Sequence, residues 1–357
     1  MRVALVGPLQ SGKSTVFAAV AQAGGSHVDL HRADQPHLAV VKVPDDRVTW
    51  LAERYHPQRS TLAELEFLDL PGFDLTSESG RAAAKTHWPA MRQSDMLAFV
   101  LRNFENPTVA PYRGRVEPQA DLRELLEELI FADLEQTAGR IDKLQAALRK
   151  SGDPHHRENE HELGLMQQVR QALESEKPIS QVATDPQDQK LLRSFAFLSS
   201  KPALVVLNCS EQAGAEGGGE TFGPLPAVHL SAKIEAELSQ LAPQERAEFM
   251  ADLGIAESAR DKLIHACYRA MNLVSFLTVG DVDCRAWTVP AGTDAVTAAG
   301  HVHSDMARGF IRAETVAFED LRAAGDMKAA RATGKVRLEG KGYIVQDGDV
   351  INFRFNV

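Results

Sequence analysis

The sequence GPLQSGKS, residues 7 to 14, follows the apolar run Arg2–Val6 and precedes Ser14–Gln22, which is rich in small and apolar residues. A G-x-x-x-x-G-K-[ST] pattern between an expected strand and an expected helix is typical of a phosphate-binding loop (P-loop). Such a loop turns its backbone N–H groups inward, and the helix N-terminus adds partial positive charge. An ordinary tight turn is the alternative. The motif comprises Gly7, Pro8, Leu9, Gln10, Ser11, Gly12, Lys13 and Ser14, with Thr15 next.

The residues of this loop are of the types that bind the phosphates and the metal ion of a nucleotide. Glycine at positions 7 and 12 permits the turn, Lys13 reaches the β and γ phosphates, and the Ser14 hydroxyl is a ligand for Mg²⁺. The sequence therefore predicts a site for a nucleoside triphosphate with Mg²⁺ at the end of the first strand.

Short apolar runs that alternate with amphipathic stretches predict a wound α/β sheet around this loop. The segment 106–118 carries three prolines and is expected to be a loop. The further strands expected in the sheet are His37–Val43, Ala63–Leu68, Met96–Leu101, Ala203–Leu207 and Ala227–Leu230.

The composition excludes several classes of protein. The 357 residues correspond to about two or three domains. A formal net charge of −10 argues against a protein that coats nucleic acid through its overall field. No stretch approaches the ~20 apolar residues of a membrane-spanning helix, and Val3–Val6 is too short for a signal sequence. Cys209, Cys267 and Cys284 show no disulfide or metal spacing, so we expect a reducing, cytoplasmic location.

Two further motifs predict the rest of a nucleotide site. The D-x-x-G pattern at Asp69 and Gly72 is typical of a switch segment, in which Asp69 acts on Mg²⁺ and the Gly72 N–H senses the γ phosphate. After the strand Ala203–Leu207 stand Asn208 and Glu211, where guanine-specific proteins carry N-K-x-D. The element Ser231-Ala232-Lys233 is expected to meet the base, although by itself it also fits an ordinary helix N-cap.

Helical spacing of apolar residues from Asp121 to about Phe195, broken at residues 151–154, predicts an antiparallel helical hairpin. From Leu273 the pattern changes to a separate α+β unit. Two strands are expected around Gly280, and a hairpin is expected to join Lys341–Val345 to Val350–Phe355 across residues 346–349.

These motifs, in this order and with N-x-x-E in place of N-K-x-D, resemble the YchF-type or Obg-like ATPases. The likeness covers essentially the whole chain, and it includes Phe104-Glu105-Asn106. It implies a P-loop G domain over residues 1–120 and 196–272, a helical coiled-coil insertion over 121–195 and an ubiquitin-like TGS domain over 273–357. The C-terminal segments that carry the resemblance are Arg285–Val289, Gly309–Glu314, Arg337–Lys341, Tyr343–Val350 and Phe353–Val357.

The resemblance also implies a function. Such proteins prefer ATP over GTP, and we expect Mg²⁺-dependent ATP binding with slow hydrolysis by a monomer that acts as a ribosome-associated or stress-regulatory switch. The alternative is a GTP-binding or hydrolysis-deficient module that binds RNA or the ribosome through the TGS domain and the hairpin. The residues expected to surround the nucleotide are those of the P-loop with Thr15, together with Asp69, Gly72, Asn208, Glu211, Ser231, Ala232 and Lys233; Ser14 and Asp69 are expected at the metal.

Several positions depart from the family pattern. Leu9-Gln10 replaces Pro-Asn, and Ala33 stands where the first switch carries a Thr ligand for Mg²⁺. The second switch, 73–85, retains only Gly80, and Pro111 stands where the family has a His that is proposed to assist hydrolysis. Phe73 is apolar, as in the family. The side chains considered as compensation are His31, Arg32, Arg81, Arg113 and Arg115.

Other polar clusters fit structural roles better. His155, His156 and His161 near the hairpin tip, and His301 with His303 in the C-terminal unit, could hold a metal, but solvated surface positions are favoured. A basic group in the C-terminal unit, for which RNA contact is the minority interpretation, comprises Lys328, Arg331, Lys335, Arg337 and Lys341.

We predict that Lys13→Ala abolishes nucleotide binding and leaves the fold intact, because it removes a charge-assisted phosphate contact from a loop. Calorimetric titration with ATP and circular dichroism check the two parts. A variant that binds ATP as well as the parent does would show that the P-loop assignment is wrong.

Overall fold

The computed structural model describes residues 1–22, 35–150, 154–183, 185–211, 219–238, 240–252 and 257–356. Contacts between residues divide the chain into two compact units. Unit 1 comprises Met1–Ala39 and Glu66–Ala259, and unit 2 comprises Val40–Leu65 and Arg260–Val357. The sequence-based division differs at residues 40–65, which it assigns to the nucleotide domain. Among the described residues, no helix combines the length and the apolar character that a membrane crossing requires.

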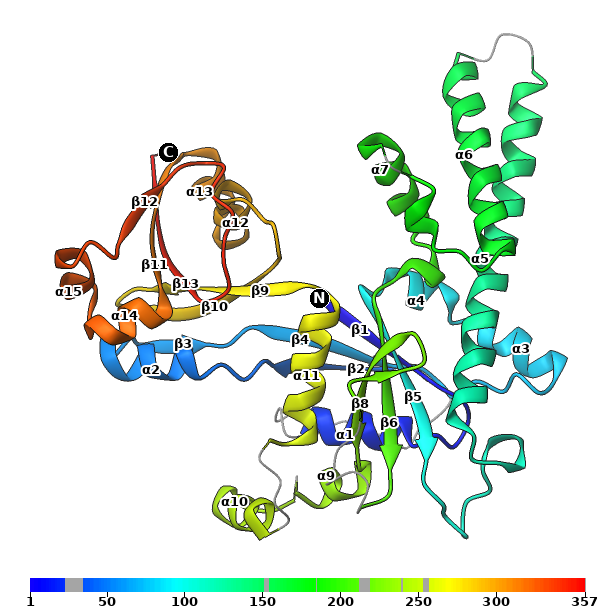
Figure 1. Ribbon diagram of the computed structural model, residues 1–357, viewed down its shortest axis with the longest axis horizontal. Helices are drawn as coiled ribbons and strands as arrows, with labels where there is room; N and C mark the ends of the chain where they lie inside the picture. Colours follow the sequence, from blue (N-terminus) through cyan, green and yellow to red (C-terminus); the bar gives the residue numbers. More distant parts are fainter. Residues whose placement is uncertain are drawn as a thin grey trace. The chain divides into compact units, whose positions relative to one another are not determined.

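A seven-stranded sheet carries the P-loop, and its strand order is β2-β4-β1-β5-β6-β8-β7. The pairs β1–β4, β1–β5, β5–β6 and β6–β8 are parallel (Figure 1). Strand β7 runs antiparallel to β8. Parallel strands buried on both faces explain why the sequence shows continuous apolar runs. The strands are β1 (Arg2–Val6), β2 (His37–Lys42), β4 (Glu64–Asp69), β5 (Met96–Asn103), β6 (Ala203–Cys209), β7 (Thr221–Phe222) and β8 (Leu225–Leu230).

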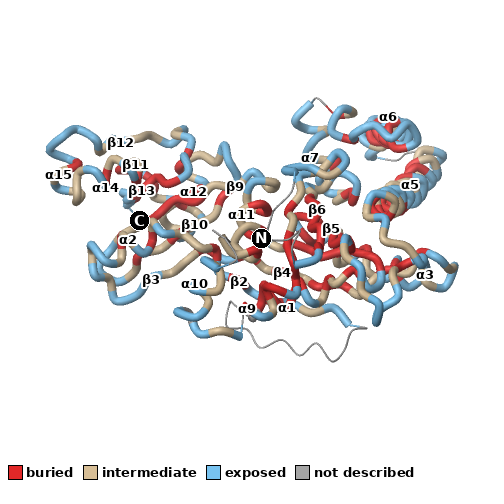
Figure 2. Tube along the Cα trace, turned by 60° about the horizontal axis from the view of Figure 1, so that its bottom comes forward, coloured by how far each residue is buried: buried red, intermediate tan, exposed pale blue. Residues whose placement is uncertain are grey.

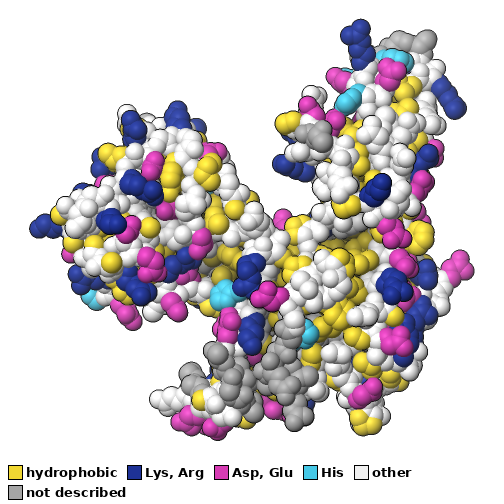
Figure 3. Space-filling model, viewed as in Figure 1, with side chains coloured by type: hydrophobic (Ala, Val, Ile, Leu, Met, Phe, Trp, Pro, Cys, Tyr) yellow, Lys and Arg dark blue, Asp and Glu magenta, His cyan; other side chains and the backbone are white. Residues whose placement is uncertain are grey.

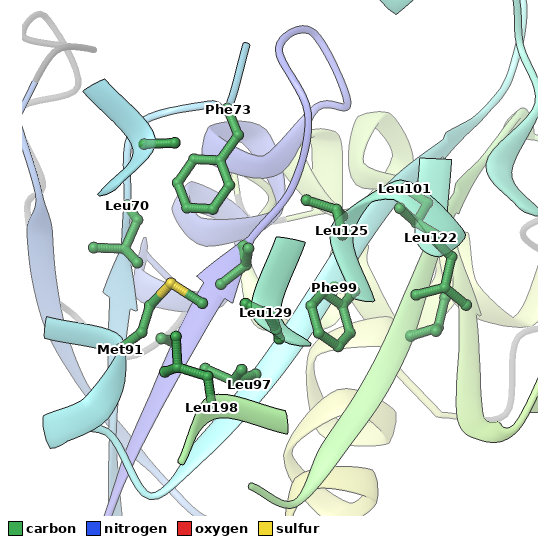
Figure 4. Close-up of a cluster of buried hydrophobic side chains, with 14 of the residues drawn as sticks. Leu70, Phe73, Met91, Leu97, Phe99, Leu101, Leu122, Leu125, Leu129 and Leu198 are labelled. Atoms are coloured by element: carbon green, nitrogen blue, oxygen red, sulfur yellow. The ribbon is translucent and has the colours of Figure 1, made fainter. Parts of the chain in front are cut away.

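Helices α4 and α5 pack on one face of this sheet, and Figure 2 shows β5 and β6 as largely buried. Alternate residues of β5 meet apolar residues of α4 and α5 in one cluster (Figure 4). The helices of unit 1 are α1 (Lys13–Gln22), α3 (Glu78–Lys85), α4 (Trp88–Gln93), η1 (Tyr112–Gly114), α5 (Pro118–Leu148), α6 (His156–Glu174), η2 (Ile179–Gln181), α7 (Pro186–Phe195), η3 (Leu198–Ser200), α9 (Ala232–Leu238) and α10 (Pro243–Asp252).

The expected hairpin consists of α5 and α6, which run side by side beyond the sheet (Figure 1). The first half of α5 packs on the sheet, whereas its second half shares a separate apolar cluster with α6 and α7. Arg140 and Glu162 join the two long helices by two hydrogen bonds of 2.6 and 2.7 Å. The insertion therefore has its own core and is also rooted in the core of the sheet.

The buried carboxylate of Asp133 fixes the end of the insertion to α5. It accepts hydrogen bonds from Arg92 Nη1 at 2.8 Å, from Leu198 N–H at 3.0 Å and from Ser199 N–H and Oγ at 2.8 Å each. Its residue is 0% exposed. A buried charge with this many partners is costly to leave incomplete.

We predict that Asp133→Ala lowers the free energy of unfolding by about 3–5 kcal/mol, because the Arg92 guanidinium loses its buried partner. Denaturant unfolding measures the change. The control is Glu135→Ala on the same helix, which removes an exposed ion pair with Lys85 and should change stability by about 1 kcal/mol or less. Equal effects of the two substitutions would contradict the anchoring role of Asp133.

Unit 2 contains a six-stranded sheet with the order β12-β11-β13-β9-β10-β3. Residues 40–65 contribute helix α2 and strand β3, and β3 pairs in parallel with β10. Arg47 of α2 donates to Asp45 and to Asp347. The elements are α2 (Asp46–Tyr55), β3 (Arg59–Thr61), α11 (Ala259–Ala270), β9 (Leu273–Val279), β10 (Asp283–Pro290), α12 (Ala295–Val302), α13 (Ser304–Arg308), β11 (Phe310–Ala317), α14 (Phe318–Ala324), α15 (Met327–Ala332), β12 (Arg337–Glu339) and β13 (Asp349–Phe355).

The predicted hairpin across residues 346–349 is wrong. β13 pairs with β11 and β9, and Lys341–Val345 forms no strand beside it. Instead, Ala295 N–H donates to Tyr343 O at 2.8 Å, and Val345 N–H donates to Thr293 O at 3.0 Å. Residues 346–349 do form the expected turn, in which Asp349 N–H donates to the Gln346 carbonyl at 3.2 Å. The segment before the turn, however, hydrogen-bonds through its backbone to the start of α12.

The α/β fold class, with a P-loop sheet, an inserted helical hairpin and a C-terminal α+β unit, is confirmed. The strands expected around Gly280 are β9 and β10, which pair antiparallel. Helix α2 and strand β3 are additions that the periodicity of the sequence did not indicate, and the helical stretch that ends near Phe195 contains a third, separate helix, α7.

Candidate nucleotide-binding site

The P-loop connects β1 to α1 through backbone conformations that only certain residues tolerate. Gln10 and Gly12 have positive φ angles of 61° and 84°. A Cβ on Gly12 would lie 2.1 Å from Asn208 Nδ2, and one on Gly7 would lie 2.4 Å from the Val100 carbonyl oxygen. Glycine is therefore required at both positions, by close approach at position 7 and by conformation and space at position 12.

Lys13 and Asp69 form a buried ion pair at the base of the loop. The Lys13 Nζ donates a hydrogen bond to the Asp69 carboxylate, and the two residues are 5% and 2% exposed. Burial lowers the pKa of Lys13, although the Asp69 charge opposes that change. Because Lys13→Ala leaves the Asp69 carboxylate buried without its ion-pair partner, we expect this variant to lose stability as well as affinity, contrary to the expectation from the sequence alone.

The D-x-x-G turn docks directly on the P-loop. Phe73 N–H donates to the Gly7 carbonyl at 3.0 Å, and Leu9 N–H donates to the Phe73 carbonyl at 3.1 Å. A Cβ on Gly72 would lie 3.1 Å from Leu9 Cα. The structure thus brings the two motifs together, with Gly72 beside the loop that is expected to hold phosphates.

Asn208 links the P-loop to the S-A-K element. Its Nδ2 donates to the Ser11 carbonyl at 3.1 Å, and its Oδ1 accepts from Ala232 N–H at 3.1 Å. The residue is 4% exposed. Ser231 Oγ accepts from Ile234 N–H at 3.4 Å, so Ser231 also interacts with the first turn of α9 as an N-cap would.

A cavity of about 740 Å³ opens beside these loops. Glu211 and Lys233 lie at its edge and form a 2.6 Å ion pair between largely exposed side chains. Thr15 of α1 lines the same cavity. The lining residues are Gly12, Thr15, Phe104, Glu105, Asn106, Pro107, Asn208, Cys209, Ser210, Glu211, Ser231, Ala232 and Lys233.

Sequence reasoning did not assign Phe104 to the site, although it used Phe104-Glu105-Asn106 as a mark of family likeness. The Arg102 guanidinium lies 4.7 Å from the Phe104 ring centre and donates to the Phe104 carbonyl at 3.1 Å. The ring thereby forms a fixed aromatic wall of the cavity. The sequence does contain a sign of this role, because Phe104 is an aromatic residue that directly follows the buried strand β5. That strand pairs with β1, which leads into the P-loop.

The arginines considered as compensation lie with α5 instead of lining the cavity. Arg81 donates to the Leu75 carbonyl at 3.0 Å and pairs with Glu128 at 3.5 Å. Arg113 pairs with Glu124 and also donates to the Leu75 carbonyl. Arg115 contacts Glu117 at 2.6 Å and Asp121 at 3.8 Å.

These contacts join the second switch to the insertion. Leu75 N–H donates to the Tyr112 hydroxyl at 3.2 Å, and that hydroxyl donates to Glu124 of α5 at 3.3 Å. Lys85 of α3 pairs with Glu135 at 2.6 Å. Pro111 directly precedes Tyr112, so the loop that contains it is held against the switch by its neighbour. Ala33, His31 and Arg32 lie outside the described residues.

Three of the expected surface histidines, His155, His161 and His303, have local partners. His155 contacts Glu158 at 2.8 Å, and His161 contacts Asp188 at 2.6 Å. The Nδ1 of His303 accepts from Asp305 N–H at 3.2 Å at the start of α13. Within the described part of the chain, no group of three or more His, Cys, Asp or Glu residues has the arrangement of a metal site.

Comparisons with known proteins show what the whole chain is similar to. The family model YchF-GTPase_C, described as a protein of unknown function (DUF933), matches residues 273–356. The chain is 38% identical to "Ribosome-binding ATPase YchF" of Bacillus subtilis (strain 168) over 99% of this chain and 98% of that protein. It is 33% identical to "Obg-like ATPase 1" of Oryza sativa subsp. japonica over 100% of this chain and 92% of that protein.

A solved structure shows the same fold. The Schizosaccharomyces pombe YchF GTPase matches with a TM-score of 0.82 and 26% identity, over 99% of this chain and 97% of the other. The sheet, the glycine-dependent loop and the D-x-x-G turn docked on it define a P-loop nucleotide-binding protein. The chain belongs to the YchF family.

We predict that Gly12→Ala lowers the free energy of unfolding by about 1–3 kcal/mol and removes most nucleotide affinity, because a Cβ forces both a strained φ and a displaced Asn208. Thermal unfolding and calorimetry measure the two effects. The control is Gly139→Ala in α5, where a Cβ meets nothing within 4 Å. An unchanged affinity in Gly12→Ala would show that the loop does not need its present conformation.

Proposed function

We propose that this protein binds ATP with Mg²⁺ in the cavity beside the P-loop and hydrolyses it slowly to ADP and phosphate. The observation that carries the proposal is that Gly12 of the P-loop, Asn208 and the S-A-K element line one cavity. The buried Lys13–Asp69 pair follows Gly12 directly in the chain and does not itself line that cavity. Relatives named as ribosome-binding ATPases support a switch that acts with the ribosome. The domain division given by the sequence is part of this proposal, except that residues 40–65 group with the C-terminal unit. The helical insertion over 121–195 is proposed as a subdomain that shares part of its core with the sheet.

The residues present fit a triphosphate with its metal. Ser11 Oγ is buried and has no hydrogen-bond partner among the described residues, so a donor is available inside the loop. Ser14 and Asp69 offer oxygen atoms, which Mg²⁺ prefers, together with phosphate and water oxygens. When bound, Mg²⁺ neutralises charge on the phosphates. Lys13 would exchange part of its interaction with Asp69 for the phosphates, and Gly72 N–H would face the γ phosphate.

The residues expected to surround the base favour adenine over guanine. A guanine-specific site needs a free carboxylate to accept hydrogen bonds from two guanine N–H groups. Here the Glu211 carboxylate is paired with Lys233, and Cys209 replaces the usual lysine. Asn208 holds the two loops that enclose the base, and the Phe104 ring offers a stacking surface.

The second candidate function is a nucleotide-gated binding module in which hydrolysis is incidental. The contacts that favour it run from Leu75 of the second switch through Tyr112 to Glu124 of α5. A change in the switch would therefore act on the root of the helical insertion. Single-turnover hydrolysis with Mg²⁺, in the presence and absence of ribosomes, separates an ATPase from such a module.

The C-terminal unit is a weaker candidate for RNA contact than its basic residues suggest. Residues 273–356 contain ten Lys and Arg and eleven Asp and Glu. Arg331 pairs with Glu314 at 2.8 Å, and Lys335 pairs with Asp320 at 3.0 Å. Figure 3 shows basic and acidic side chains interspersed over this unit on the visible face. Contact with a ribosome would therefore depend on particular residues and not on a uniform positive field.

We predict that the parent binds ATP more tightly than GTP by about 1–2 kcal/mol, the size of one mismatched hydrogen bond. Competition titration with the two nucleotides measures the ratio. Lys233→Met frees the Glu211 carboxylate and should shift the ratio toward GTP, whereas Glu211→Gln should not. A clear GTP preference in the parent would refute the adenine assignment.

A further inference from the structure

Position 73, directly after the D-x-x-G turn, lacks any group that could hold the water needed for hydrolysis. The Phe73 backbone is bonded to Gly7 and Leu9 of the P-loop, and the side chain is 2% exposed. Its ring packs with the residues of the cluster shown in Figure 4. A phenyl ring of this kind neither donates to nor accepts from water, so another side chain is required if hydrolysis occurs.

The His87 imidazole stacks on the Phe73 ring. The two ring centres are 6.2 Å apart and the planes differ by 6°, while Trp88 meets the same phenyl ring edge-on at 5.6 Å. His87 directly precedes α4, and its carbonyl accepts from Met91 N–H at 3.0 Å. The backbone at the start of α4 and the Phe73 ring therefore both constrain the imidazole.

The imidazole has capacity for hydrogen bonding and lies in the field of the P-loop lysine. Within the described residues its ring nitrogens have no hydrogen-bond partner, and it is only partly exposed. Burial and the positive charge of Lys13 lower the pKa of His87. Of the described charged groups, Lys13 is the one that acts on this pKa, and Lys13 is itself paired with Asp69. A neutral imidazole, able to accept a proton, is the form expected near pH 7.

We propose that His87 orients the attacking water and accepts its proton during hydrolysis of the γ phosphate, the task that Phe73 cannot perform. The inference rests on the proposed nucleotide site. The water oxygen forms a bond to the γ phosphorus while the bond from phosphorus to the β–γ bridging oxygen breaks, and ADP leaves with that electron pair. The water proton passes to the neutral imidazole and then to solvent.

The first test measures the His87 pKa by NMR of the histidine side chains, with Mg²⁺ and either ADP or a non-hydrolysable ATP analogue. The γ phosphate adds negative charge close to the imidazole, so the analogue should raise the His87 pKa more than ADP does. His161, which is exposed on α6 and pairs with Asp188, is the internal control, and its pKa should not differ between the two nucleotides. If both nucleotides bind and the His87 pKa is the same with each, the inference is refuted. If neither binds, the proposed function itself has failed.

The second test compares His87→Phe with His87→Gln in single-turnover ATP cleavage. Phenylalanine keeps an aromatic ring on Phe73, and it should slow cleavage by about 10²-fold while nucleotide affinity is retained. Glutamine can hold a water without taking its proton, so it should recover part of the rate. Equal rates in the parent and His87→Phe would overturn the proposal, as would a loss of affinity that accounts for the whole effect.

The pH profile gives a readout that a purely structural role would not change. Cleavage by the parent should fall as the pH drops through the His87 pKa, because the protonated imidazole cannot accept a proton. His87→Gln should lack this acidic limb, and His301→Phe should keep it. An acidic limb that persists unchanged in His87→Gln would assign the titration to another group and would count against His87.

Discussion

The side-chain amide of Asn208 is the contact on which the candidate site depends. It joins the Ser11 carbonyl of the P-loop to the Ala232 N–H of the S-A-K element, across 197 and 24 residues of sequence. Both bonds are buried, where hydrogen bonds are strong and unpaired groups are costly. The same amide occupies the space that a Cβ on Gly12 would need. One residue at the end of β6 thus sets the shape of the loop and the position of the base-facing segment.

The electrostatics of the site follow from burial. Lys13 and Asp69 neutralise each other below the loop, so the protein does not leave a buried charge alone when the phosphates are absent. In the proposed complex with a triphosphate and Mg²⁺, negative phosphates would face Lys13 and the positive metal would face Asp69, so each charge would again have a partner of opposite sign. At the mouth of the cavity the Glu211–Lys233 pair is exposed, so its contribution to stability in water is small. The role that we propose for this pair is to disfavour guanine.

The second switch is placed where it can affect both the phosphates and the insertion. Phe73 holds one end of it on the P-loop, and Leu75 is bonded to Tyr112 and the arginines beside α5. Helix α5 in turn is rooted in the sheet through its apolar first half and through Asp133. A movement of a few residues after Asp69 would therefore reach a long helix without crossing a flexible segment.

The sequence by itself determined the wound sheet, the glycines of the P-loop, the order of the motifs and the helical insertion. These features depend on local periodicity and on conformations that few residues tolerate, as at Gly12. Tertiary structure alone decided that strand β3 completes the C-terminal sheet and that Lys341–Val345 holds α12 instead of pairing with β13. It also decided that Phe104 lines the cavity and that His87 stacks on Phe73. Such contacts join residues that are distant in sequence, and no local pattern specifies which distant partner a strand edge or an aromatic ring will meet.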